Sequence, residues 1–119
     1  MKEAVEYSTE EKEVFEGTSS RKRREILESA IEQVCGHRVE DYGKPEDSFQ
    51  RIGMLWSAYL FNDTNGYNFS PKDVAVMMAL MKIARIKTDV KSDSYVDLAG
   101  YAACAGEIGI MERKGNSNN

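Results

Sequence analysis

Two basic and two acidic residues stand on either side of a short connection in the C-terminal half of the chain. Lys82 and Arg85 are three residues apart, and Asp93 and Asp97 are four apart. Either spacing places a pair on one face of a helix. Two such carboxylates can share a divalent cation, and Mg²⁺ typically takes one or two carboxylates together with substrate phosphates. The four residues therefore indicate a site for a phosphorylated ligand, with Lys82 and Arg85 as substrate-binding residues for its phosphates.

A structural interpretation of the same residues is also open. Acidic side chains stabilise helix N-termini and basic ones stabilise C-termini, by about 0.3–1 kcal/mol each. Arg85 could also pair with Asp97 between neighbouring helices. The functional interpretation is favoured because charged residues, Lys82 and Arg85, intrude on the most apolar helix predicted for the chain, residues 71–87.

A row of glutamates could complete a metal site. Glu25, Glu28 and Glu32 follow one another at spacings of three and four, so they share one side of a helix. A metal-dependent phosphohydrolase needs several convergent carboxylates to bind metal and activate water. Glutamates at this spacing are also common on solvated helix faces, where Arg21 and Arg24 could pair with them.

Asp41 and Tyr42 precede Gly43 in a segment rich in turn residues, 36–45. They could form only a tight turn. They could also close over a base or ribose, as an acid and an aromatic ring on a mobile loop. Cys35 and Cys104 have no metal-type spacing and are expected to be reduced, buried thiols.

Apolar spacing, together with helix start and stop residues, predicts an all-α fold. Ser70, Pro71 and Asp73 form a helix start with a cap, a proline at the first position and an acid at the third. The expected fold is an antiparallel bundle of four main helices, with short connections between neighbours. The helices are predicted at residues 21–35, 45–61, 71–87 and 93–113. The predicted domain limits are an acidic arm and linker at 1–20, the bundle at 21–113, and a disordered tail at 114–119.

Composition excludes several classes of protein. The chain has 119 residues, of which 41% are hydrophobic and 30% charged, and this suits a single soluble domain. No apolar run approaches the roughly 18 residues of a membrane span. The net charge of −4 argues against bulk nucleic acid as a partner. The acidic start lacks the features of a secretory signal, so a cytoplasmic location is expected.

Two surfaces predict a homo-oligomer. The helix at 93–113 has a Gly/Ala-rich face, and the helix at 45–61 carries several aromatic residues. Together these two surfaces present more apolar area than a small monomer needs to bury.

Several segments of the chain resemble a family of small, mostly uncharacterised proteins of bacteriophages and prophages. The resemblance covers roughly residues 26–108. It rests on residues 41–43, Phe49, Arg51, Ile52 and residues 55–60, 74–85 and 93–103. The last segment also looks like the closing helix of phage nucleotide-modification-associated proteins. More distantly, it looks like the MazG-type all-α nucleoside triphosphate pyrophosphohydrolases.

The MazG-type enzymes bind Mg²⁺ through a Glu-x-x-Glu pair and a Glu-x-x-Asp pair. Glu25 and Glu28 match the first pair, whereas Asp93 and Asp97 have three residues between them rather than two. The resemblance implies a phage-type, Mg²⁺-dependent nucleotide pyrophosphohydrolase of the host cytoplasm. Glu25, Glu28, Asp93 and Asp97 would bind the metal, with Glu28 and Asp97 catalytic. One alternative is a protein that binds a nucleotide-derived signal of host defence without turnover, and another is a helical assembly protein.

Overall fold

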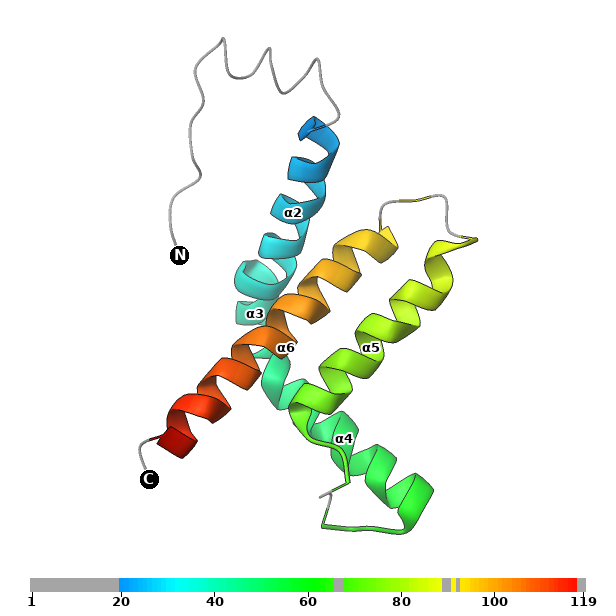
Figure 1. The fold of residues 1–119 in the computed structure, drawn as a ribbon, viewed down its shortest axis with the longest axis vertical. Coiled ribbons are helices and arrows are strands. Elements are labelled where there is room, and N and C mark those ends of the chain that lie inside the picture. Colours follow the sequence, from blue (N-terminus) through cyan, green and yellow to red (C-terminus); the bar gives the residue numbers. More distant parts are fainter. Residues whose placement is uncertain (1–19, 66–67, 89–90, 92, 118–119) are drawn as a thin grey trace.

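The computed structural model describes residues 20–65, 68–88, 91 and 93–117, and in these residues all regular structure is helical (Figure 1). Four long helices and one short helix follow each other along the chain. They are α2 (Ser20–Cys35), α3 (His37–Tyr42), α4 (Pro45–Phe61), α5 (Pro71–Ile86) and α6 (Asp93–Ser117). The predicted all-α class is confirmed.

The ends of the helices follow from local chemistry. Ser70 caps α5: its hydroxyl accepts the Asp73 N–H, and the Asp73 carboxylate accepts the Ser70 N–H. This reciprocal pair satisfies two N–H groups that a helix start leaves without partners. Pro45 occupies the first turn of α4, where its missing N–H costs nothing. Asn62 ends α4 in the left-handed conformation, with φ 53°.

The helices α5 and α6 form an antiparallel hairpin, which is the main pairing of the fold (Figure 1). α2 packs along α6, and α4 crosses α5. The core lies where α4, α5 and α6 meet. Its buried hydrophobic residues are Phe49, Val74, Ala75, Cys104, Ala105 and Ile108.

A glycine allows α4 to approach the segment that precedes α5. Gly53 is buried, and a Cβ placed there would lie 2.7 Å from the carbonyl oxygen of Phe69 and 3.3 Å from Val74 Cγ2. Such a contact with a backbone oxygen is shorter than van der Waals packing allows. Trp56 then stacks edge-on against Phe69, with ring centroids 5.8 Å apart.

The structure corrects two sequence predictions about chain segments. The predicted turn at residues 36–45 contains the helix α3, because His37–Tyr42 holds no Gly or Pro and remains helical until Gly43, whose φ is 83°. The described part of the predicted tail, residues 114–117, is helical, because α6 continues to Ser117 with Lys114 in its last, dipole-favoured turn. Most of the predicted arm, residues 1–19, and the last two residues lie outside the described part.

α5 is less enclosed than its apolar sequence suggests. It packs against α4 and α6, and its remaining side has no cover in the described structure. Five of its large apolar residues are exposed, namely Val76, Met77, Leu80, Met81 and Ile83. Within the described residues, none of the helices has the length and hydropathy needed to cross a membrane.

Candidate functional site

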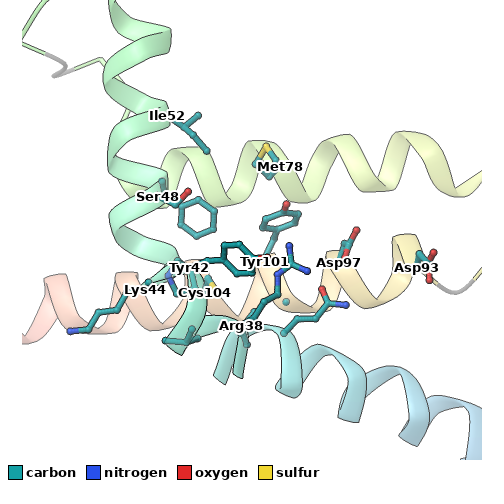
Figure 2. Close-up of a pocket in the computed structure, with 17 residues that line it drawn as sticks. Arg38, Tyr42, Lys44, Ser48, Ile52, Met78, Asp93, Asp97, Tyr101 and Cys104 are labelled. Atoms are coloured by element: carbon teal, nitrogen blue, oxygen red, sulfur yellow. The ribbon is translucent and has the colours of Figure 1, made fainter. Parts of the chain in front are cut away.

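A cleft of about 590 Å³ opens beside the first half of α6. Its walls come from the end of α2, from α3 and its following turn, from the first half of α4, and from α5 (Figure 2). The polar and aromatic residues that line it include Arg38, Tyr42, Lys44, Ser48, Asp93, Asp97 and Tyr101. The apolar part of the lining includes Phe49, Ile52, Met78 and Cys104.

The short helix α3 brings a cation and an aromatic ring to this cleft together. Arg38 and Tyr42 are four residues apart on α3, and the guanidinium lies 5.4 Å from the centroid of the Tyr42 ring. Figure 2 shows Arg38 reaching towards Tyr101 and Asp97 on α6, while Lys44 extends away from them. A planar ligand could therefore lie against Tyr42 and Tyr101 with a cation beside it.

The floor of the cleft depends on a close approach between two helices. Gly100 of α6 is buried against α2, and a Cβ there would lie 3.1 Å from Val34 Cγ1. On the same helix, Tyr101 contacts Phe49 of α4, with ring centroids 6.0 Å apart. The tight packing holds Tyr101 in position one turn beyond Asp97.

A second cavity, of about 570 Å³, lies at the end of the α5/α6 hairpin. It has three basic residues and two acidic ones in its wall. The lining consists of Lys82, Arg85, Thr88, Lys91, Asp93, Ser94 and Asp97. Asp93 and Asp97 also line the cleft, so the two spaces adjoin at these carboxylates.

Lys82 and Asp97 form the ion pair that joins α5 to α6 at this point. The ammonium nitrogen of Lys82 lies 3.0 Å from Asp97 Oδ2, and the two side chains are 12% and 29% exposed. The predicted gathering of basic and acidic residues at one end of the hairpin is thus present. The partner of Asp97 is Lys82 rather than Arg85, and Arg85 is exposed in the wall of the second cavity.

The structure does not bring the glutamates of α2, Glu25, Glu28 and Glu32, to either cavity. Glu25 pairs with Arg21 at 3.2 Å and with Lys22 at 3.4 Å, and Glu28 pairs with Arg24 at 2.8 Å. Across residues 20–65, 68–88, 91 and 93–117, no three His, Cys, Asp or Glu side chains gather as a potential metal site.

The four predicted metal ligands therefore do not converge within one chain. Asp41 is exposed and lines neither cavity, whereas its neighbour Tyr42 does.

Among the polar and aromatic residues of the cleft, the sequence analysis missed Arg38, Lys44, Ser48 and Tyr101. Tyr101 continues the stripe of Asp93 and Asp97 by four residues, so helical spacing alone could have found it. Arg38 stands one turn before Tyr42, but this relation exists only because α3 is a helix. Lys44 directly follows Gly43, and nothing in its sequence context marks it as a lining residue.

We predict that the two thiols differ strongly in reactivity. Both thiols were expected to be buried, but only Cys104 is, whereas Cys35 is exposed. Burial raises the pKa of the Cys104 thiol to about 11. Because the thiolate is the nucleophile, Cys104 stays protonated and slow to react until the pH approaches that pKa. At pH 8, iodoacetamide is expected to alkylate Cys104 at least about 10-fold more slowly than Cys35. Peptide mass spectrometry over a time course would measure both rates, with urea-unfolded protein as the control. Equal rates in the folded protein would contradict this prediction.

Comparison with known proteins identifies the family. Residues 25–109 match the model of a domain of unknown function, DUF6378, so the chain belongs to that family. It is 43% identical over 89 residues to the Gene 55 protein of Mycobacterium phage L5, covering 74% of this chain and 51% of that relative.

A second phage relative gives a similar result. The Gene 55 protein of Mycobacterium phage D29 is 44% identical over 84 residues, covering 70% of this chain and 52% of that relative. The chain thus spans about half the length of these curated relatives. The predicted resemblance to a small phage family is confirmed. No solved structure matches.

Proposed function

We propose that this member of the DUF6378 family binds a phosphorylated nucleoside across the cleft and the adjoining basic cavity. The observation that carries the proposal is the position of Asp93 and Asp97, which line both spaces. On one side of these carboxylates the wall is aromatic, and on the other side it is basic. A nucleotide has the same division between a planar base and a phosphate chain.

The cleft supplies groups suited to a base and a sugar. Tyr42 and Tyr101 offer ring faces for stacking, and Arg38 offers a planar cation beside Tyr42. The carboxylate of Asp93 or Asp97 can accept hydrogen bonds from ribose hydroxyls. A volume of about 590 Å³ is within the range of small-molecule sites, which is about 300–1,000 Å³.

The second cavity supplies groups suited to phosphates. Arg85 presents a planar fork of N–H donors, and Lys91 lies in the same wall. Lys82 forms an ion pair with Asp97, so the carboxylate largely neutralises the charge of the Lys82 ammonium group. Arg85 is accordingly the residue that we expect to contribute most to phosphate affinity.

Binding without turnover is the form of this proposal that the geometry supports best, since the predicted metal ligands do not converge in one chain. The relatives are phage proteins. In that setting, capture of a nucleotide-derived signal would deprive the host of it. The proposal includes a homo-oligomer as the assembled form.

Hydrolysis is the second candidate, and the observation that favours it is again the Asp93–Asp97 pair. Two carboxylates with substrate phosphates suffice for many Mg²⁺ sites. Asp93 and Asp97 would be the residues that hold the ion, which would neutralise phosphate charge and activate water. Release of pyrophosphate in the presence of Mg²⁺, abolished by Asp97→Ala, would establish this candidate.

The binding proposal is tested by calorimetry with a panel of nucleoside mono-, di- and triphosphates. Tyr42→Ala and Arg85→Ala are each expected to weaken binding at least about 10-fold, since each removes one side of the recognition. The effect of Arg85→Ala should grow with the number of phosphates, and that of Tyr42→Ala should not.

Matched controls come from outside the two cavities. Arg51→Ala removes one exposed positive charge, and Tyr59→Ala removes one exposed ring, so both should bind as the unmodified protein does. A ligand that binds the folded state raises its melting temperature by mass action. The proposal is therefore wrong if no nucleotide binds in calorimetry and none raises the melting temperature. A control variant as weak as Arg85→Ala would also contradict it.

A further inference from the structure

The cleft offers a hydrogen-bond donor and a hydrogen-bond acceptor that come from two different helices. Arg38 of α3 and Asp97 of α6 both line it, and Figure 2 shows the Arg38 side chain reaching towards Asp97. A guanidinium carries N–H donors only, and an ionised carboxylate carries acceptors only. A flat ligand in this part of the cleft would therefore meet donors from one residue and acceptors from the other.

Both groups keep hydrogen-bonding capacity for a ligand. In the part of the chain that the structure describes, Arg38 forms no ion pair with Asp97 or with any other carboxylate, and its guanidinium lies 5.4 Å from the centroid of the Tyr42 ring. The Lys82 ammonium lies 3.0 Å from Oδ2 of Asp97. Because an ionised carboxylate has about four lone-pair sites, Asp97 can accept further hydrogen bonds, chiefly on Oδ1.

The order of side chains along α6 fits a nucleotide that lies along this helix. Asp93, Asp97 and Tyr101 are four residues apart, which is about 6 Å for each step. Both carboxylates border the basic cavity, whereas Tyr101 lines the cleft alone. With the phosphates in the basic cavity, the ribose would lie at Asp93 and the base at Asp97 and Tyr101. Asp97 then meets the edge of the base, and Asp93 is left for the ribose hydroxyls.

This pairing of donors and acceptors suits guanine better than the other bases. Guanine presents the acceptors N7 and O6 side by side, and arginine binds both of them at once. Its neighbouring N1–H and N2–H₂ groups are donors, and a carboxylate can accept from both. Adenine has the N6–H₂ donor in place of O6 and an acceptor at N1, so it would set a donor against Arg38 and an acceptor against Asp97. Cytosine and uracil can engage both residues, but each gives the carboxylate a single donor group.

We propose that the cleft selects guanine, with Arg38 donating to O6 and N7 and Asp97 accepting from N1–H and N2–H₂. This inference rests on the proposed binding of a phosphorylated nucleoside, and it names the base. Tyr42 and Tyr101 stack on the ring system without choosing between bases, since every base has a π-face. Gln33 also lines the cleft, but its amide carries both donors and an acceptor and so fits several bases.

The test is calorimetry of the full chain with GTP, ATP, CTP, UTP and ITP, in EDTA so that Mg²⁺-dependent hydrolysis does not interfere. These ligands share their sugar and phosphates and differ only in the base. GTP is expected to bind at least about 10-fold more tightly than ATP, CTP or UTP, because a bidentate pair discriminates against the wrong base. ITP should lie between GTP and ATP, since its base keeps O6, N7 and N1–H but lacks the N2 amine.

Two substitutions test the two residues separately. Arg38→Lys keeps the positive charge but loses the planar fork, so it should lower the ratio of GTP affinity to ATP affinity at least about 5-fold. Asp97→Asn should lower the same ratio and remove the difference between GTP and ITP, because an amide offers one acceptor oxygen in place of two. A merely structural role for either residue would instead weaken all the nucleotides alike and leave the ratio unchanged.

Matched controls come from α4. Arg51→Lys and Asp47→Asn make the same chemical changes at exposed residues that line neither cavity, so both should keep the ratio of the unmodified protein. Equal affinities for GTP and ATP, or for GTP and CTP, would overturn the guanine assignment and leave the proposed nucleotide binding intact. A preference for GTP that survives both cleft substitutions would overturn the roles of Arg38 and Asp97. If none of the nucleotides binds, the proposed function fails together with this inference.

Discussion

Gly53→Ala is expected to lower the free energy of unfolding by about 1–3 kcal/mol, the usual cost of overpacking a core. The added Cβ would stand 2.7 Å from the carbonyl oxygen of Phe69, which is backbone and cannot rotate away. The clash is relieved only if α4 moves away from the segment that precedes α5. This movement loosens the contact between Trp56 and Phe69. At roughly 4 °C per kcal/mol for a domain of this size, the melting temperature should fall by about 4–12 °C.

Gly109→Ala is the matched control for this substitution. Gly109 is also within a helix, but a Cβ there would meet only the Lys72 side chain at an ordinary 3.6 Å. Alanine is favoured over glycine in a helix by up to about 1 kcal/mol, so Gly109→Ala should raise the melting temperature or leave it unchanged. Thermal unfolding, monitored by circular dichroism, measures the melting temperatures of both variants. If the Gly53→Ala variant is as stable as the Gly109→Ala variant, then α4 does not pack closely against the backbone of Phe69 and the prediction is wrong.

Lys82→Met is expected to have the largest combined effect on stability and binding. Methionine keeps most of the volume but leaves the half-buried Asp97 carboxylate without its cation. Removing one partner of a fully buried pair costs about 3–5 kcal/mol. Because Asp97 is 29% exposed, solvent screening should reduce the loss to about 1–2 kcal/mol. Nucleotide affinity should fall at least about 10-fold, since the carboxylate shared by both cavities would add an unbalanced negative charge.

A double-mutant cycle separates the ion pair from other effects of the substitution. Lys82→Met and Asp97→Leu together remove both charges, so the double variant should be more stable than Lys82→Met alone. Urea unfolding measures stability, and calorimetry measures binding. The double variant should not recover nucleotide affinity, because it also lacks the Asp97 carboxylate. Additive single effects on stability would mean that the ion pair contributes nothing.

The parts of the fold that the sequence predicts are those set by local chemistry. Ser70, Pro71 and Asp73 specify the start of α5, and the structure shows the reciprocal capping bonds. Pro45 and Phe61 were predicted as the limits of α4 and are its limits. The gathering of Lys82 and Asp97 was also predictable, because antiparallel helices joined by a short connection place their adjacent ends together.

What the sequence could not supply depends on contacts between distant segments. Glu25 and Glu28 have the spacing of metal ligands, yet local arginines at i−4 pair with both, and spacing alone cannot distinguish these outcomes. Arg38 becomes part of the cleft only through the helix α3 and the packing of α2 on α6. The apolar sequence of α5 likewise does not show which of its sides is covered, because that depends on how α4 and α6 pack against it.

The attachment of α3 has a consequence for how this family could diversify. The helix lies between Gly36 and Gly43, packs chiefly against α2, and contributes no residue to the buried core. Substitutions in its six residues can therefore alter the wall of the cleft at little cost to folding. The bundle would act as a constant frame, and α3 as an exchangeable segment through which related phages would change the lining of the cleft.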